Sequence, residues 1–176
     1  ENKDGEELTI NFASMSGGDT AEPLAQYYIQ SWEAVGLKVQ LVDGRLLEFN
    51  SFYDRVEGDD PAIDIYQGAW GTGTDVNPAG IFAGNSPANY PRWTNEENDE
   101  LLAQGASMQA MDTEYRKEVY DKWQQLMVDN IPMFPTLYRS VLVPVNNRVT
   151  NYTLDPASDL RRYQIGVTEA ESVVAE

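Results

Sequence analysis

Residues 63–78 read IDIYQGAWGTGTDVNP and join a short strand pattern to a glycine-rich loop. In residues 63–66, apolar side chains alternate with a polar one, which is the pattern of a short buried strand. The loop that follows contains Trp70, then Asp75, and ends in Asn-Pro. In open α/β sheets, ligands bind beyond the carboxyl ends of the strands. The stretch therefore predicts either a ligand loop or a plain strand-to-helix connection with a core tryptophan.

The glycines of this loop stand at positions 68, 71 and 73. Glycine adopts positive φ without steric cost and lets another backbone approach closely. We therefore expect these three positions to give the loop an unusual backbone path or a close contact with a ligand.

Two more strand patterns lie upstream, at residues 8–12 and 37–42, and both alternate with period two. The segment between them predicts a helix that begins at a capping Asp19 and stops at Gly36. Its expected apolar face consists of Leu24, Tyr27, Tyr28, Trp32 and Val35.

A second helix pattern separates residues 37–42 from residues 63–66, with one face formed by Phe49, Phe52, Tyr53 and Val56. The chain thus alternates strand, helix, strand, helix, strand. This order favours an α/β fold in which parallel strands are covered by helices.

Downstream, residues 77–93 look irregular, and Thr94-Asn95-Glu96-Glu97 forms a capping box that predicts a helix. A longer helix is expected from a capping Asp112 to Ile131, because Pro132 must end it. Residues 133–145 are apolar but broken by prolines, which favours an edge strand or an extended crossing segment. Residues 160–167 predict one more strand.

Composition excludes several classes of function. The 29 acids and 12 bases give a formal net charge of −17, which repels nucleic-acid phosphates. Without cysteine or histidine, the chain has no disulfides, thiolate nucleophiles, zinc-finger sites or histidine-based triads. Since no apolar run approaches about 18 residues, we expect no membrane insertion by this chain. The charged start, residues 1–7, predicts a disordered end and a piece excised from a longer protein.

Catalytic candidates are few. Asp59-Asp60 precedes a proline in an expected turn, where solvation explains both acids, and no calcium-loop pattern is present. We therefore expect no enzyme activity, no metal and no cofactor.

Aromatic residues make up 11% of the chain and offer contact area at low entropic cost. A tryptophan wall, one acid and exposed loop amides would suit a cationic amine, a peptide or a sugar.

Several motifs in order carry a resemblance to a known family: AQYYIQSW (25–32), GLKV (36–39), DGR (43–45), EFNSFYD (48–54), AWGTGTD (69–75), PRWTNEEN (91–98) and IPMFP (131–135). They resemble the C-terminal lobe of extracellular solute-binding proteins of family 5, the peptide-binding receptors of bacterial ABC importers. The likeness is to the Gram-positive oligopeptide-binding type.

The resemblance implies a periplasmic-binding-protein-like lobe of type II, cluster C, with a mixed, mostly parallel sheet flanked by helices. Residues 8–145 would form this lobe, and residues 146–176 a trailing segment that returns toward a missing N-terminal lobe. It also implies a receptor that captures extracellular oligopeptides for a membrane permease. The complete protein would be lipid-anchored at the extracellular face of the membrane.

The resemblance further implies a ligand site formed by Trp70, Gly71, Thr72, Gly73, Thr74 and Asp75. Asp75 matches the acid that often pairs with the peptide α-ammonium, although residues 71–74 lengthen the gap seen in enteric-type relatives. A lobe of the same family for a nickel chelate, a sugar or a peptide pheromone is an alternative, and a carboxylate-based hydrolase is another. A single lobe predicts weak or undetectable peptide binding by this chain alone.

Overall fold

The computed structural model describes residues 5, 8–71, 73, 75–138, 140, 142–154 and 162–169 of the 176. The described residues group into two compact units. The first comes from residues 1–71 and 77–132, and the second from residues 72–76 and 133–176. The predicted lobe of residues 8–145 and its trailing segment stay predictions.

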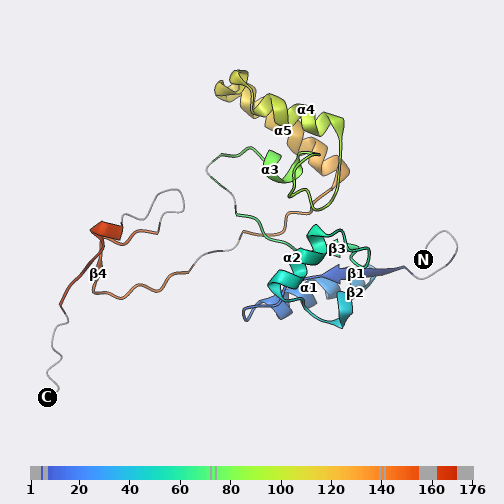
Figure 1. Ribbon diagram of the computed structural model, residues 1–176, viewed down its shortest axis with the longest axis horizontal. Helices are drawn as coiled ribbons and strands as arrows, with labels where there is room; N and C mark the ends of the chain where they lie inside the picture. The colour runs from blue at the N-terminus through green and yellow to red at the C-terminus, as the bar shows by residue number, and fades with distance from the viewer. Residues whose placement is uncertain are drawn as a thin grey trace, which may run out of the picture. The chain divides into compact units, whose positions relative to one another are not determined.

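The first unit begins with the alternation that the sequence predicts (Figure 1). Its elements are β1 (Thr9–Ala13), α1 (Ala21–Glu33), β2 (Lys38–Leu41), the 3-10 turn η1 (Val42–Gly44), α2 (Phe49–Glu57) and β3 (Ile65–Tyr66). The three strands are parallel and lie in the order β2-β1-β3. The α/β prediction is therefore confirmed, with β1 in the centre of the sheet.

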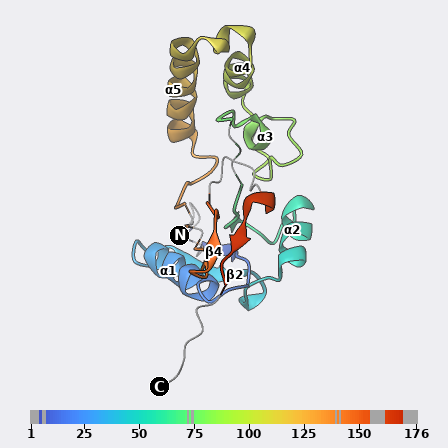
Figure 2. The same cartoon turned by 90° about the vertical axis from the view of Figure 1, so that its left-hand side faces the viewer.

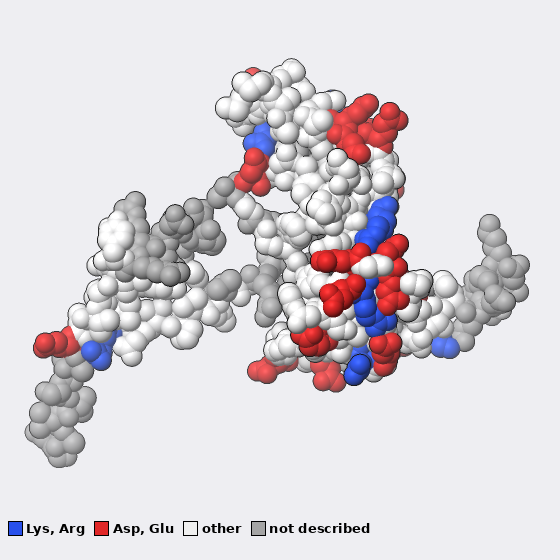
Figure 3. Space-filling view, in the orientation of Figure 1, with Lys and Arg blue, Asp and Glu red and all other residues white. Residues whose placement is uncertain are grey.

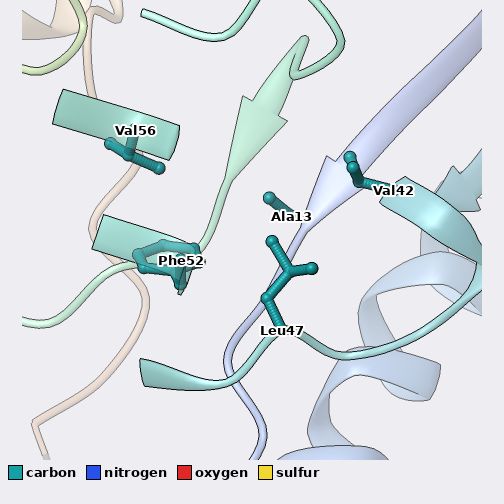
Figure 4. Close-up of a cluster of buried hydrophobic side chains, with 5 residues drawn as sticks. All are labelled: Ala13, Val42, Leu47, Phe52 and Val56. Carbon is teal, nitrogen blue, oxygen red and sulfur yellow. The ribbon is translucent and has the colours of Figure 1, made fainter. Parts of the chain in front are cut away.

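Successive side chains of β1 point to opposite faces of the sheet, so this strand contributes to two apolar clusters. Phe12 packs with Ala25 of α1 and Val39 of β2. Ala13 belongs to the other cluster, which Figure 4 shows together with Phe52 of α2. Figure 2 shows α1 and α2 on opposite sides of the strands. One helix thus covers each face of the sheet.

Helix α1 differs from its prediction at its start and in the face that it buries. Thr20, not Asp19, precedes the helix, and its side chain makes no capping hydrogen bond. Ala25 is the most deeply buried residue of α1, whereas Tyr27 and Val35 are 64% and 76% exposed. The small Ala25 side chain allows close approach to Phe12, which turns the expected apolar face partly outward.

The remaining regular elements of the first unit are helices: α3 (Ala79–Phe82), α4 (Glu96–Gly105), the 3-10 turn η2 (Met108–Met111) and α5 (Thr113–Asn130). The N-cap predicted from the capping box at residues 94–97 is shifted by one residue, because Asn95 and not Thr94 caps the helix and accepts from the N–H of Asn98. The predicted cap at Asp112 is confirmed. Helix α5 ends before Pro132 as predicted. Ile131 follows it with φ 48° and ψ 52°, in the left-handed region.

The second unit contains a small antiparallel pair, β4 (Val149–Thr150) with β5 (Gly166–Val167), and the 3-10 turn η3 (Arg162–Gln164). The strand predicted over residues 160–167 is confirmed only for Gly166–Val167, and Leu160 lies outside the described residues. The described residues of 133–145 belong to neither helix nor strand.

Acidic side chains are spread over the face that Figure 3 shows, and arginine and lysine lie among them. None of the helices in the described ranges combines the length and the apolar character needed to cross a membrane.

Candidate functional site

The glycine-rich loop leaves the sheet at the carboxyl end of β3. Just after Tyr66, the N–H of Gln67 donates to the carbonyl oxygen of Ala13 at 2.9 Å. The side chain of Gln67 accepts from Ser14 Oγ at 3.1 Å. These two contacts fix the start of the loop beside the end of β1, the neighbouring strand.

Beyond Gln67 the main chain is open to solvent. Trp70 is 53% exposed, which contradicts the alternative of a core tryptophan in a plain connection. At Gly71, an added Cβ would meet no atom within 4 Å. Within the described part of the chain, the backbone N–H groups of residues 68–71 donate no hydrogen bond. This segment therefore exposes an indole and main-chain N–H groups to solvent.

The other predicted site residues belong to the second unit. Gly73 and Asp75 are exposed there, and an added Cβ at Gly73 would meet no atom within 4 Å. Thr72 and Thr74 lie outside the described residues.

Gly68 and Gly71 do not adopt positive φ, so what these glycines contribute is the absence of a side chain. Positive φ occurs instead after β1, at Gly17 (121°) and Gly18 (78°). There the turn requires glycine, because other residues reach these angles only with strain.

Sequence reasoning did not anticipate that the loop after β1, residues 14–18, begins beside the end of β3. Met15 pairs with Leu47, and the N–H of Ser16 donates to the Leu47 carbonyl at 2.7 Å. Because β1 and β3 are parallel neighbours, both strands end at the same edge of the sheet, where Ser14 Oγ donates to Gln67 Oε1 at 3.1 Å. In open α/β sheets, ligands bind in the crevice beyond the carboxyl ends of two neighbouring strands whose following helices cover opposite faces of the sheet. In the sequence, the run Ser16-Gly17-Gly18 is the signal that marks the turn after β1.

Tyr66 lies beneath the start of this loop. Its ring packs against the cluster around Phe52, and burial raises the pKa of its phenol to about 12. A Cβ added at Gly68 would lie 3.4 Å from Tyr66 Cε2, so the edge of the ring lies on the side of Gly68 where a side chain would be. The loop thus begins next to a tyrosine that is packed in the apolar cluster around Phe52.

Asp60, one of the two adjacent acids noted in the sequence, has a structural role. Asp60 accepts from the N–H of Ala62 and pairs with Arg55 Nε at 2.6 Å. Both contacts hold the pKa of Asp60 below its usual value. Asp43 binds the other side of the same guanidinium at 2.6 Å. Within the described residues, no group of three or more acids is placed to hold a metal ion.

No family model matches the sequence. The "Oligopeptide-binding protein OppA" of Lactococcus lactis subsp. lactis (strain IL1403) is 36% identical over 169 residues, which cover 94% of this chain and 28% of the relative. "Di/tripeptide-binding protein 3" of Pseudomonas aeruginosa (strain UCBPP-PA14) is 24% identical over 84% of this chain and 27% of that protein. The chain therefore spans less than a third of the length of these curated relatives.

Solved structures agree with the sequence relatives. Lactococcal OppA, complexed with an endogenous peptide in the closed conformation, matches 94% of this chain and 31% of its own with a TM-score of 0.82 and 32% identity. AppA from Bacillus subtilis, in complex with a nonapeptide, matches in fold, with a TM-score of 0.73 at 16% identity, over 96% of this chain and 33% of its own. The chain is thus homologous to a part of lactococcal OppA, and its fold is that of the type II peptide-binding proteins.

Proposed function

We propose that this chain is one lobe of the substrate-binding component of an ABC importer, which captures extracellular oligopeptides. The proposal is carried by the exposed main chain and indole of residues 68–71 at the carboxyl edge of a parallel sheet, in a homologue of OppA. Main-chain hydrogen bonds suit many peptide sequences, because they do not read side chains.

The proposed ligand residues remain Trp70, Gly71, Thr72, Gly73, Thr74 and Asp75. In this proposal the indole of Trp70 packs on the peptide. The carboxylate of Asp75 takes the peptide α-ammonium, since charge-assisted hydrogen bonds are the strong ones. Exposed glycine backbone at positions 71 and 73 lets the peptide main chain approach closely.

The proposed lobe comprises residues 8–145, with residues 146–176 as a trailing segment. Relatives are more than three times as long, so the second jaw of the clamp lies in chain that has no counterpart here. We further propose that the complete receptor is lipid-anchored at the extracellular face, delivers peptide to a membrane permease and catalyses no reaction.

A chimeric receptor tests this function. The chain replaces its homologous segment in lactococcal OppA, and calorimetry measures binding of an oligopeptide. Trp70→Ala should weaken binding by about 2 kcal/mol, as expected for a tryptophan anchor. Trp32→Ala should chiefly lower the melting temperature, because Trp32 packs edge-on to Phe12 at 5.2 Å. The reverse pattern would move the site away from the loop.

The isolated chain provides a second test. A clamp that lacks one jaw leaves the site wet, so peptide binding by the 176-residue chain should be weak or undetectable. Low-micromolar or tighter binding of a hexapeptide would contradict the clamp arrangement. A chimera that binds a sugar or a nickel chelate in place of oligopeptides would contradict the proposed substrate class.

A further inference from the structure

A turn far along the chain docks on the end of α2. Arg92 Nη2 donates to the carbonyl oxygens of Val56 at 3.1 Å and Glu57 at 2.7 Å. Its Nη1 donates to the carbonyl of Tyr90 at 2.6 Å. The last carbonyls of a helix have no partner within the helix. Arg92 therefore closes the C-terminal end of α2 from outside that helix.

The same turn is continuous with the aromatic core. The hydroxyl of Tyr90 donates to Glu57 Oε1 at 2.9 Å, and its ring lies 6.3 Å from that of Tyr53. Tyr53 contacts Phe52 at 5.2 Å, and Phe52 contacts Tyr66 at 6.1 Å between ring centroids. These four side chains, Phe52, Tyr53, Tyr66 and Tyr90, form what we call the aromatic link.

The aromatic link ends at the candidate site, because the Tyr66 ring lies where a Cβ added at Gly68 would meet it at 3.4 Å. We propose that residues 90–92 are a positioning element of the ligand site. Through the aromatic link, they hold the main chain of residues 68–71 in the conformation that receives the ligand. This inference rests on the proposed function, since Trp70 and Gly71 belong to the site assigned there.

Arg55 provides a matched control within the same helix. It also anchors the C-terminal part of α2, but its partners are Asp43 and Asp60, each at 2.6 Å. Neither partner belongs to the aromatic link. Lysine at position 55 or 92 keeps the charge but loses the planar fork that binds several acceptors at once. Both substitutions therefore weaken the anchoring of α2, and only Arg92→Lys disturbs the aromatic link.

The ring current of Tyr66 shifts the NMR resonances of Gly68 Hα. This chemical shift reports the position of the ring and does not change when the protein is only less stable. In NMR spectra of the 176-residue chain, the Gly68 Hα resonances should be displaced by the ring. Arg92→Lys should return them toward random-coil positions and lower the order parameters of residues 68–71. Arg55→Lys should leave both unchanged. Tyr90→Phe, which removes only the bond to Glu57, repeats the test if Arg92→Lys does not fold.

Binding is measured in the chimeric receptor with an uncapped hexapeptide of alanine and glycine. Arg92→Lys should raise the dissociation constant roughly three- to tenfold, and Arg55→Lys should leave it unchanged. The positioning role is overturned if Gly68 keeps its shift in Arg92→Lys and Tyr90→Phe, or if Arg55→Lys displaces it equally. A folded wild-type chimera that binds no peptide overturns the proposed function instead, while the Gly68 shift still decides the positioning role.

Discussion

Around the sheet of the first unit, the largest fully buried side chains are Phe12 and Phe52, whereas among α3, α4 and α5 it is Asn98. Phe12 and Phe52 pack in apolar clusters, one on each face of the sheet. Asn98 instead accepts from Trp123 Nε1 at 3.0 Å and donates to the carbonyl of Phe82 at 2.7 Å. Neighbouring parts of one unit are thus organised by different forces.

The difference teaches how each part obtains a defined arrangement. Apolar burial is not directional, so α1 and α2 settle where area and shape fit. A buried amide is directional, and leaving its partners unpaired is costly, so Asn98 sets the positions of α3 and α5 relative to α4. The packing of α1 and α2 on the sheet therefore depends mainly on side-chain volume. The packing of α3, α4 and α5 depends on specific hydrogen bonds.

The largest effect should come from Phe52→Ala, which empties the centre of one apolar cluster. We expect a loss of about 3–5 kcal/mol in the free energy of unfolding. Denaturant unfolding followed by circular dichroism measures it. Phe49→Ala is the matched control in the same helix, because Phe49 is 58% exposed. Equal losses from both variants would refute apolar burial as the force that holds the sheet.

Asn98→Leu should cost about 2–3 kcal/mol, because it leaves Trp123 Nε1 and the Phe82 carbonyl unpaired in a buried place. Amide hydrogen exchange should accelerate in α4 and α5 more than in β1. If Asn98→Leu is as stable as the parent protein, apolar packing can also hold α3, α4 and α5 together. The difference between the sheet and these helices would then disappear.

A smaller gain is expected at the end of α5. Ile131 has φ 48°, a conformation that is costly for a β-branched residue and that asparagine tolerates. Ile131→Asn should raise the free energy of unfolding by about 1 kcal/mol. Val128→Asn is the control, since Val128 is 67% exposed and lies within the helix. Stabilisation by both variants would point to exposed apolar area, not to backbone strain.

The smallest effect concerns pH. Burial raises the pKa of Tyr66 from 10.0 to about 12, so the folded state retains this proton where the unfolded chain has lost it. Stability from this group is complete below about pH 10 and is lost as the pH rises toward 12. Tyr66→Phe should make the alkaline decline in unfolding free energy shallower. An unchanged decline would place the phenol in water, outside the apolar cluster.

The alternation of strands and helices was predictable, because side-chain periodicity and helix ends are local properties. Asp112 caps its helix as expected, and the other cap lies one residue from the expected place, at Asn95 instead of Thr94, since a capping side chain bonds to backbone two or three residues away. Pro132 ends α5 for an equally local reason, its effect on the residue before it. The resemblance to oligopeptide-binding receptors was also readable from the order of short motifs.

Other features depend on contacts between segments distant in sequence. Ala25 rather than Tyr27 faces the sheet, because the depth available above Phe12 selects a small side chain. The hydrogen bond between Ser14 and Gln67 follows from the strand order β2-β1-β3, and Trp70 beyond it is 53% exposed. Periodicity along the chain carries no information about which strands become neighbours. The sequence by itself determined the elements and some of their ends, and the tertiary structure alone decided which strands are neighbours and which loops therefore begin at the same edge of the sheet.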